Sequence, residues 1–231
     1  MSDVSTAARR MLTGDLADFL NEVKTEHALA PRGRLIFGLD ATASRKPAWD
    51  MAASLTASMF REVSVVGSLD LQLVYYRGDR ECQASGWMSD ATRLVRMMTR
   101  IECAAGETQI ERILSHAIKE TAKLQVNALV FIGDAMEECV DILVARAREL
   151  GRLKVPVFMF QEGDDSKVQT VFRDIARSTG GGYAKFDAGA ARQLGELLRA
   201  VAVVAIGGVQ ALIGRKDEAS VLLLTQMRKP Q

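Results

Sequence analysis

The chain has 231 residues, enough to bury a substantial core in one large domain or in one domain with additional segments. Lys and Arg total 30 and Asp and Glu total 29, so the formal charge of +1 gives no broad field that would attract nucleic acid or an anionic membrane. Three scattered cysteines, Cys82, Cys103 and Cys139, form no CxxC pair, which argues against a disulfide framework and a zinc site. A reducing, cytoplasmic location is therefore expected.

Residues 1–32 are predicted to form an N-terminal helical extension. Leu16, Phe19, Leu20 and Val23 follow the spacing of an amphipathic helix, and a proline and a glycine then interrupt the pattern. Because acidic residues occur in this segment and no continuous apolar run follows its arginines, it does not have the pattern of a secretory signal.

Short apolar runs then alternate with helical segments. This alternation predicts an α/β fold, a doubly wound and mostly parallel sheet of the Rossmann-like type, flanked by helices. The predicted strands are 34–40, 69–76, 127–134 and 155–160, with a short last strand at 183–186 and an antiparallel edge strand within 81–89. The predicted helices are 47–63, 89–101, 108–124, 137–151 (closed by a glycine), 166–182 and a long one from about residue 189.

The longest uncharged apolar run is 200–214, AVAVVAIGGVQALIG. At ~1.5 Å per residue it makes roughly 22 Å of helix, which is short of the ~30 Å core of a bilayer. The run is therefore expected to pack on the domain, or on a second copy of the chain in a homo-oligomer, rather than to cross a membrane.

Small oxygen-bearing side chains follow the predicted strands. Asp40 ends the first strand, with Thr42 and Ser44 after it; Thr108 precedes the third helix, and Asp134 ends a later strand. In open α/β sheets, ligands bind beyond the carboxyl ends of the strands, so these five residues are expected on one rim. Carboxylate and hydroxyl oxygens without His or Cys suit a hard cation, Mg²⁺ first and Mn²⁺ or Ca²⁺ next.

Taken singly, these residues also fit helix capping. Ser44 precedes a proline and is a candidate cap, Thr108 with Glu111 matches a capping box, and Asp134 with Glu137 imitates one. Capping alone would leave a scaffold without a metal.

At this point the sequence resembles a known family. DATAS (40–44) matches the D-x-[ST]-x-S motif of von Willebrand factor type A (vWA) domains, Thr108 matches the isolated threonine of the family, and Asp134 matches the acid that ends the later strand. The stretch 176–187, ARSTGGGYAKFD, is similar to the segment before the last strand of the family. The departures are Thr42, where serine is common, and Ala135, where glycine is frequent.

The resemblance implies a vWA-like domain at 33–205 between the N-terminal extension and a C-terminal extension at 206–231. It also implies that Asp40, Thr42, Ser44, Thr108 and Asp134 form a metal-ion-dependent adhesion site (MIDAS). The function expected is that of an intracellular, non-enzymatic module, which binds a protein partner through an acidic residue that the partner offers to the metal. Neither nucleic acid nor a membrane is expected as a partner.

Enzymatic alternatives have weaker support. DATAS resembles the D-x-D-x-[TV] signature of haloacid-dehalogenase phosphatases, but Thr42 stands in place of the second acid. The sequence contains no phosphate-binding G-x-x-x-x-G-K-[ST] loop and no G-x-S-x-G motif. The only histidines are His27, in the extension, and His116, inside an amphipathic helix. A metal-dependent phosphate-ester hydrolase remains the alternative function, followed by a metal-free vWA scaffold.

Overall fold

A computed structural model describes residues 32–43, 49, 50, 52, 55, 68–187 and 190–227. The predicted N-terminal helix lies outside the described residues, as does most of the predicted helix at 47–63 and the candidate ligand Ser44. None of the helices in the described ranges is both long and apolar enough to cross a membrane.

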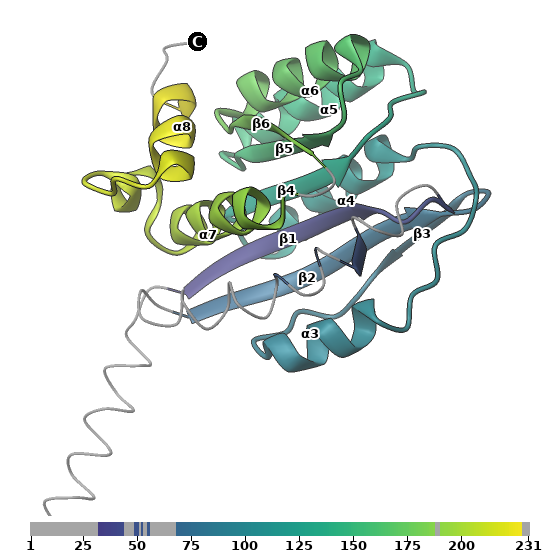
Figure 1. Cartoon of the computed structure of the whole chain (residues 1–231), viewed down its shortest axis with the longest axis horizontal. Coiled ribbons are helices and arrows are strands. Elements are labelled where there is room, and N and C mark those ends of the chain that lie inside the picture. Colours follow the sequence, from purple (N-terminus) through teal and green to yellow (C-terminus); the bar gives the residue numbers. More distant parts are fainter. Residues whose placement is uncertain are drawn as a thin grey trace, which may run out of the picture. The chain divides into compact units, whose positions relative to one another are not determined.

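The described strands form one six-stranded sheet of order β3-β2-β1-β4-β5-β6 (Figure 1). All neighbours are parallel except β2 and β3, which form an antiparallel hairpin. The strands are β1 (Arg32–Asp40), β2 (Ser68–Arg77), β3 (Glu81–Ala84), β4 (Ala128–Gly133), β5 (Val157–Glu162) and β6 (Tyr183–Phe186). The predicted α/β class is thus confirmed, including the antiparallel edge strand.

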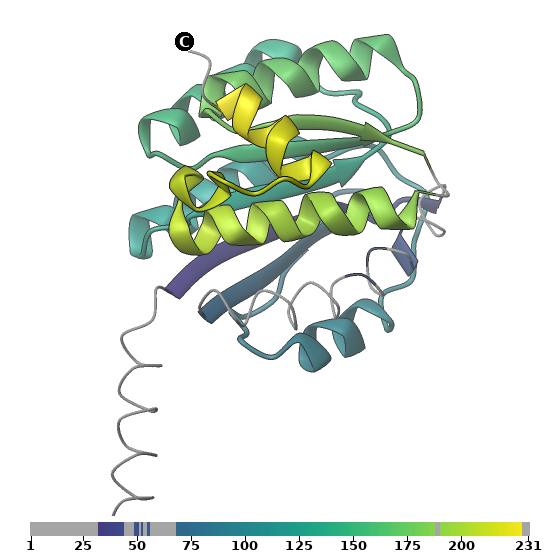
Figure 2. The same cartoon turned by 60° about the vertical axis from the view of Figure 1, so that its left-hand side comes forward.

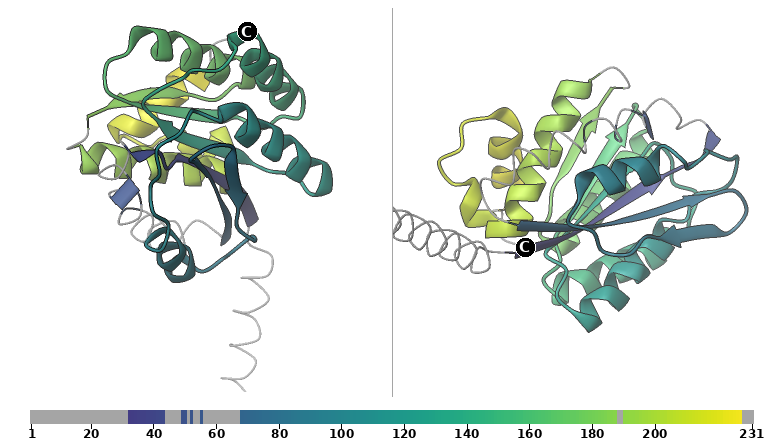
Figure 3. Two further views of the ribbon diagram at one scale, coloured as in Figure 1. Left: turned by 90° about the vertical axis from the view of Figure 1, so that its right-hand side faces the viewer. Right: turned by 90° about the horizontal axis from the view of Figure 1, so that it is seen from below.

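Helices cover both faces of this sheet. Along β1, Leu35, Phe37 and Leu39 belong to the core shared with α3, α7 and α8, whereas Ile36 faces the core shared with α4, α5 and α6. Figure 2 and Figure 3 show these two layers on opposite sides of the strands. The helices are α3 (Ala91–Met98), α4 (Ile110–Lys123), α5 (Val140–Arg152), α6 (Ser166–Thr179), α7 (Ala191–Gly207), the short 3-10 helix η2 (Val209–Leu212) and α8 (Glu218–Met227).

The C-terminal apolar run packs on the domain, as the sequence predicts. Helix α7 lies so close to β1 that a Cβ on Gly33 would come within 2.6 Å of the carbonyl oxygen of Ala205. Beyond η2, Leu223 of α8 is fully buried, and Gln226 accepts from the N–H of Tyr183 (2.7 Å) and donates to its carbonyl (2.9 Å). The predicted domain boundary at 205/206 falls inside α7.

One predicted helix end is wrong. Gly151 does not close α5, which continues to Arg152 and has Leu153 as its C-cap. A Cβ on Gly151 would stand 2.3 Å from the carbonyl oxygen of Ser178, so this glycine instead permits close packing of α5 against α6. Glycine is typical both of helix ends and of places where two helices pack closely. The sequence alone does not distinguish these two roles, which explains the wrong prediction.

A β-bulge follows β3. Gly86 and Trp87 lie opposite the single residue Gln72, because the pairing with β2 shifts by one position between Ser85 and Met88. A shift of one residue exchanges the two faces of a strand. The bulge therefore directs Trp87 to the face covered by α4.

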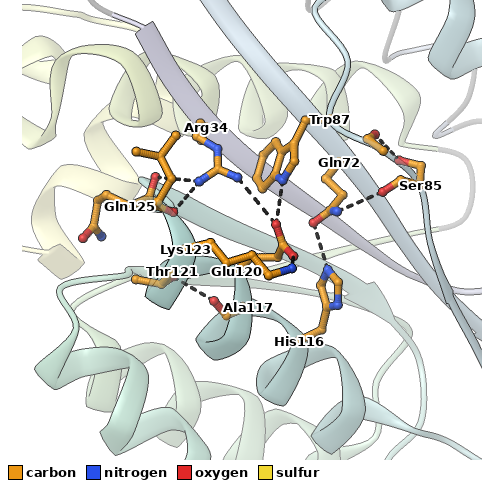
Figure 4. A network of polar contacts seen from close by, with 12 residues as sticks. Arg34, Gln72, Ser85, Trp87, His116, Ala117, Glu120, Thr121, Lys123 and Gln125 are labelled. Atoms are coloured by element: carbon orange, nitrogen blue, oxygen red, sulfur yellow. Dashed lines mark hydrogen bonds and ion pairs between the residues drawn. The ribbon is translucent and has the colours of Figure 1, made fainter.

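Trp87 joins a polar network there (Figure 4). Its indole N–H donates to Glu120 Oε2 of α4 (2.8 Å), and the guanidinium of Arg34 lies 3.8 Å from the centre of its ring. Glu120 also pairs with Arg34 (3.6 Å) and with Lys123 (2.6 Å). The network therefore fixes α4 to β1 and to the bulged segment through paired charges.

Candidate metal centre

Asp40 is the last residue of β1 and is only 3% exposed. Its Oδ1 accepts the backbone N–H of Thr42 (2.7 Å), which holds the carboxylate in a turn, while its Oδ2 is buried and makes no hydrogen bond to any described residue. Burial raises the pKa of Asp40, and the hydrogen bonds from Thr42 oppose this rise. No donor among the described residues therefore reaches this buried carboxylate oxygen, although such an atom normally has one.

Asp134 lies beside Asp40. Leu39 is level with Ile132 of the neighbouring parallel strand β4, so Asp40 is level with Gly133, and Asp134 follows directly. A Cβ placed on Gly133 would be 3.8 Å from the Cβ of Asp40. The negative charge of Asp134 adds to the rise in the pKa of Asp40. The two acids therefore share the carboxyl edge of the sheet, as the sequence predicts.

Tyr76 is a further buried residue of the candidate metal centre, and the sequence analysis did not identify it. It pairs with Asp40 in the β1–β2 register and is fully buried, and its hydroxyl makes no hydrogen bond of normal geometry to a described residue. Burial is the largest cause of the raised pKa of Tyr76, and the charge of Asp40 is the next. The hydroxyl is therefore near the carboxylate. Two buried polar groups, Tyr76 Oη and Asp40 Oδ2, thus lack satisfied partners at the same point.

Thr108 is joined to the loop after β4. Its hydroxyl accepts the N–H of Glu137 (3.0 Å), and its own N–H donates to Glu137 Oε2 (3.0 Å). The capping box predicted for Thr108 is wrong, because the N-cap of α4 is Gln109, which makes no side-chain cap. Thr108 therefore belongs to the same rim as Asp134, with its hydroxyl already in one hydrogen bond.

The missing cap of α4 comes from Glu138. Its carboxylate accepts the N–H groups of Ile110 and Glu111, both at 2.8 Å, from a different loop of the chain. Burial raises the pKa of Glu138, and these N–H groups and the hydroxyl of Thr108 lower it. The capping role predicted for Asp134 with Glu137 is also wrong, since α5 begins after Cys139. The rim is consequently more acidic than the sequence reasoning assumed.

The loops of the rim are held together by backbone contacts. Ala41 donates to the carbonyl of Tyr76 (2.9 Å) and accepts the N–H of Ala104 (3.1 Å). A Cβ on Gly106 would lie 2.1 Å from the carbonyl oxygen of Gly78, so only glycine permits this approach of the 104–109 segment to the β2–β3 turn. Thr42, the second residue after β1, is 9% exposed.

The donor set suits an oxygen-preferring cation. Asp40, Thr42, Thr108 and Asp134 contribute carboxylate and hydroxyl oxygens, the ligands of Mg²⁺, Mn²⁺ and Ca²⁺. In the described part of the chain, no three His, Cys, Asp or Glu side chains gather as a metal-binding cluster, so any site here depends on hydroxyls and water as well. The orphaned Oδ2 of Asp40 is the atom that such a cation would satisfy.

The titratable residues considered for nucleophilic chemistry lie elsewhere or are structural. His116 of α4 is half-buried, its Nε2 lies 2.9 Å from Gln72 Oε1, and burial lowers its pKa. Cys139 is exposed and is the N-cap residue of α5. His116 therefore belongs to the polar network of Figure 4 rather than to the rim.

The open and mostly parallel sheet, with one antiparallel edge strand and an oxygen-rich rim at its carboxyl edge, is that of a doubly wound α/β protein. Comparison with solved structures then gives the particular fold, that of the vWA domain. The vWA domain of SpRpn10 matches with a TM-score of 0.55 at 14% identity, over 76% of this chain and 97% of that one.

Two further structures share the fold. An aerotolerance-related membrane protein from Bacteroides fragilis, with mutations to serine, matches with a TM-score of 0.53 at 16% identity, over 72% of this chain and 96% of that one. Proximal thread matrix protein 1 from the mussel byssus, with a zinc-occupied MIDAS motif, matches with a TM-score of 0.58 at 12% identity, over 75% of this chain and 46% of that one. No protein-family model and no curated protein matches the sequence.

Proposed function

We propose that this chain is a non-enzymatic binding protein that holds a divalent cation at the rim and, through it, an acidic residue of a protein partner. The observation that carries the proposal is the Oδ2 of Asp40, a buried carboxylate oxygen with no hydrogen bond to a described residue. Leaving such an atom unsatisfied is costly, and a cation removes the cost.

The residues proposed to hold the ion are Asp40, Thr42, Thr108 and Asp134, together with Ser44, which lies outside the described residues. When bound, the ion supplies an electrophilic centre for a carboxylate. Mg²⁺ is proposed first, because its ligands here are hard oxygens. The zinc-occupied MIDAS of the mussel thread matrix protein supports a divalent ion in this fold.

Because the rim is acidic, the cation is proposed to bind before the acidic residue of the partner. Glu137 accepts the N–H of Thr108 from the loop that carries Asp134, so its carboxylate adds negative charge to the rim that holds Asp40 and Asp134. An incoming carboxylate is repelled while these charges are uncompensated. We therefore propose that partner binding requires the ion.

A thermal-shift titration with Mg²⁺ and Mn²⁺ tests the ion site. An ion at about 100 times its dissociation constant stabilises the native state by ~2.7 kcal/mol if it binds only that state. The shift should disappear in Asp40→Ala and shrink in Ser44→Ala and Thr108→Ala.

Asp90→Ala is the matched control. Asp90 accepts the N–H of Thr92 at 2.7 Å, the same local hydrogen bond that Asp40 makes with Thr42, but it caps α3. Loss of either bond lowers stability by ~1 kcal/mol, and only the loss of Asp40 should abolish the ion response. Equal responses of wild type, Asp40→Ala and Asp90→Ala would refute the proposal.

A metal-free scaffold is the second candidate, because Thr108 already makes reciprocal hydrogen bonds with Glu137. An absent ion response in the wild type would favour it. Hydrolysis of p-nitrophenyl phosphate by the wild type, and not by Asp40→Ala, would instead establish the phosphate-ester hydrolase.

A further inference from the structure

The edge strand β3 has backbone groups that face away from the sheet. Among the described strands it pairs only with β2, and the N–H of Ser85 donates to the carbonyl of Leu73 (2.8 Å). Because hydrogen-bonded pairs alternate along antiparallel strands, Gln83 and Glu81 direct their backbone groups towards β2. The N–H and C=O groups of Cys82 and Ala84 then point outwards, along an edge where Ala84 is exposed.

A basic hollow of about 460 Å³ lies on the α4 side of this edge. Cys82 and Ala84 border it from β3, and Arg112, Lys119 and Arg146 border it from the helices. Arg146 pairs with Glu111 (2.8 Å), whereas Arg112 donates to Gln109 Oε1 (2.7 Å), a neutral acceptor. The hollow therefore has more positive than negative charge and favours an acidic side chain.

The opposite face of β3 borders a second hollow, of about 420 Å³. Its walls include the apolar side chains of Leu73 and Tyr75 from β2, and of Met97 and Ile101 from α3 and the segment after it. Glu81 and Arg100 also border it, and their opposite charges give it no net charge. This hollow favours an apolar side chain. The two hollows thus lie on the two faces of one strand edge and differ in chemistry.

We propose that β3 accepts an extended segment of a partner protein as an additional strand, with acidic residues directed to the α4 side and apolar residues to the α3 side. Successive side chains of a strand point to opposite faces, so an alternating acidic and apolar segment would enter both hollows at once. The outward groups of Cys82 and Ala84 supply the main-chain hydrogen bonds. The inference does not depend on a metal at the rim.

The charge of the basic hollow argues for a partner rather than for a second copy of this strand. If two β3 strands paired edge to edge, the α4 sides would receive Cys82 and Ala84, which bring no negative charge. An acidic segment would place carboxylates beside the positive charges of Arg112 and Lys119. A second β3 strand would leave these charges without a carboxylate from the partner.

A short synthetic peptide of alternating glutamate and valine is the probe. It should bind the full chain in a fluorescence-polarisation titration in EDTA, and binding should weaken with salt. The control peptide has the same sequence with N-methyl groups on alternate residues, which removes the N–H donors on one edge. Methylation on the bonding edge should weaken binding about tenfold for each pair of lost hydrogen bonds.

Ala84→Pro tests the edge from the protein side. It removes an outward N–H without removing a bond to β2, and proline is tolerated at edge positions of this kind. Binding should fall about tenfold in this variant, and also in the double variant Arg112→Glu, Lys119→Glu. A lysine–valine peptide should show the opposite response to the charge reversal.

The place of binding can be read from cysteine alkylation followed by peptide mapping. The glutamate–valine peptide should slow the modification of Cys82, which borders the basic hollow, and should leave exposed Cys139 unchanged. No binding by this peptide, equal binding of the methylated peptides, or binding without protection of Cys82 would each overturn the inference. Formation of a dimer instead of a peptide complex would assign the edge to a second copy. Because these measurements are made in EDTA, they are independent of the ion response at Asp40.

Discussion

Replacing Asp40 by asparagine should stabilise the metal-free protein. The amide oxygen of the introduced asparagine can still accept the N–H of Thr42, as Oδ1 of Asp40 does at 2.7 Å. The new amide N–H₂ would replace the buried Oδ2 and could donate to the hydroxyl of Tyr76, so that both atoms without hydrogen bonds gain a partner. Removing the buried charge adds to this gain.

The magnitude follows from the cost of an unsatisfied buried polar group, about 1–3 kcal/mol. For a chain of this size, each kcal/mol corresponds to a change of about 2–4 °C in the melting temperature. In EDTA, Asp40→Asn should therefore melt above the wild type. Calorimetry with matched urea denaturation measures the difference.

The pH dependence has a defined sign. Burial raises the folded-state pKa of Asp40 above its unfolded value, so the ionised carboxylate lowers stability at pH values above the folded-state pKa. Protonation on acidification removes that penalty. The advantage of Asp40→Asn should be greatest above the folded-state pKa and should narrow as the pH falls through it.

Divalent ions should reverse the order of stability. Wild type gains about 2.7 kcal/mol at 100 times the dissociation constant of the ion, whereas Asp40→Asn has lost the carboxylate and should gain far less. A variant that is less stable than the wild type in EDTA, at pH values where Asp40 is ionised, would refute the reasoning that its buried oxygen is unsatisfied. Identical ion responses would refute the assignment of that oxygen to a cation.

Three further substitutions test contacts that hold helices and loops on the sheet. Glu120→Gln should destabilise the chain by about 3 kcal/mol, because it leaves the charge of Arg34 without its buried partner, whereas Lys123→Gln should cost about 1 kcal/mol or less; urea denaturation compares them. Gln226→Ala should cost about 1–3 kcal/mol by removing both hydrogen bonds to Tyr183, and hydrogen exchange should show β6 opening more readily. Gly106→Ala should cost about 1–3 kcal/mol and weaken the ion response, because its Cβ would stand 2.1 Å from Gly78; an unchanged melting temperature would contradict the close approach.

The elements that depend on long apolar patterns could be predicted from the sequence. Neighbouring parallel strands end at the same edge of a sheet, so Asp40 and Asp134 could be placed together from the amino-acid order alone. Tyr76 could not be recognised in this way, because within LDLQLVYY it is one more apolar core residue. Only its pairing with Asp40 in the parallel register brings its hydroxyl to the carboxylate.

Trp87 shows a second limit. Alternation along 81–89 predicts an edge strand, but it cannot reveal that one additional residue lies opposite Gln72. That residue reverses which side chains face α4. The contact of Trp87 with Arg34 and Glu120 follows from this local change, and a regular alternating pattern would have placed the indole on the other face.

The acidic loop 134–138 explains why capping signals were misread. Local spacing assigns a glutamate to the helix that follows it in the chain. Glu138 instead caps α4, which comes before it in the chain and is separated from it by β4. Glu137 accepts the N–H of Thr108, just before α4. The N–H groups at the start of α4 bind whichever carboxylate the fold brings near, because an uncapped helix end and a nearby acid attract each other regardless of sequence distance. The loop after β4 thereby becomes attached to the segment before α4, and a displacement of Asp134 must disturb Thr108 as well. A change at one part of the candidate site is therefore transmitted to the other through Glu137 and Glu138.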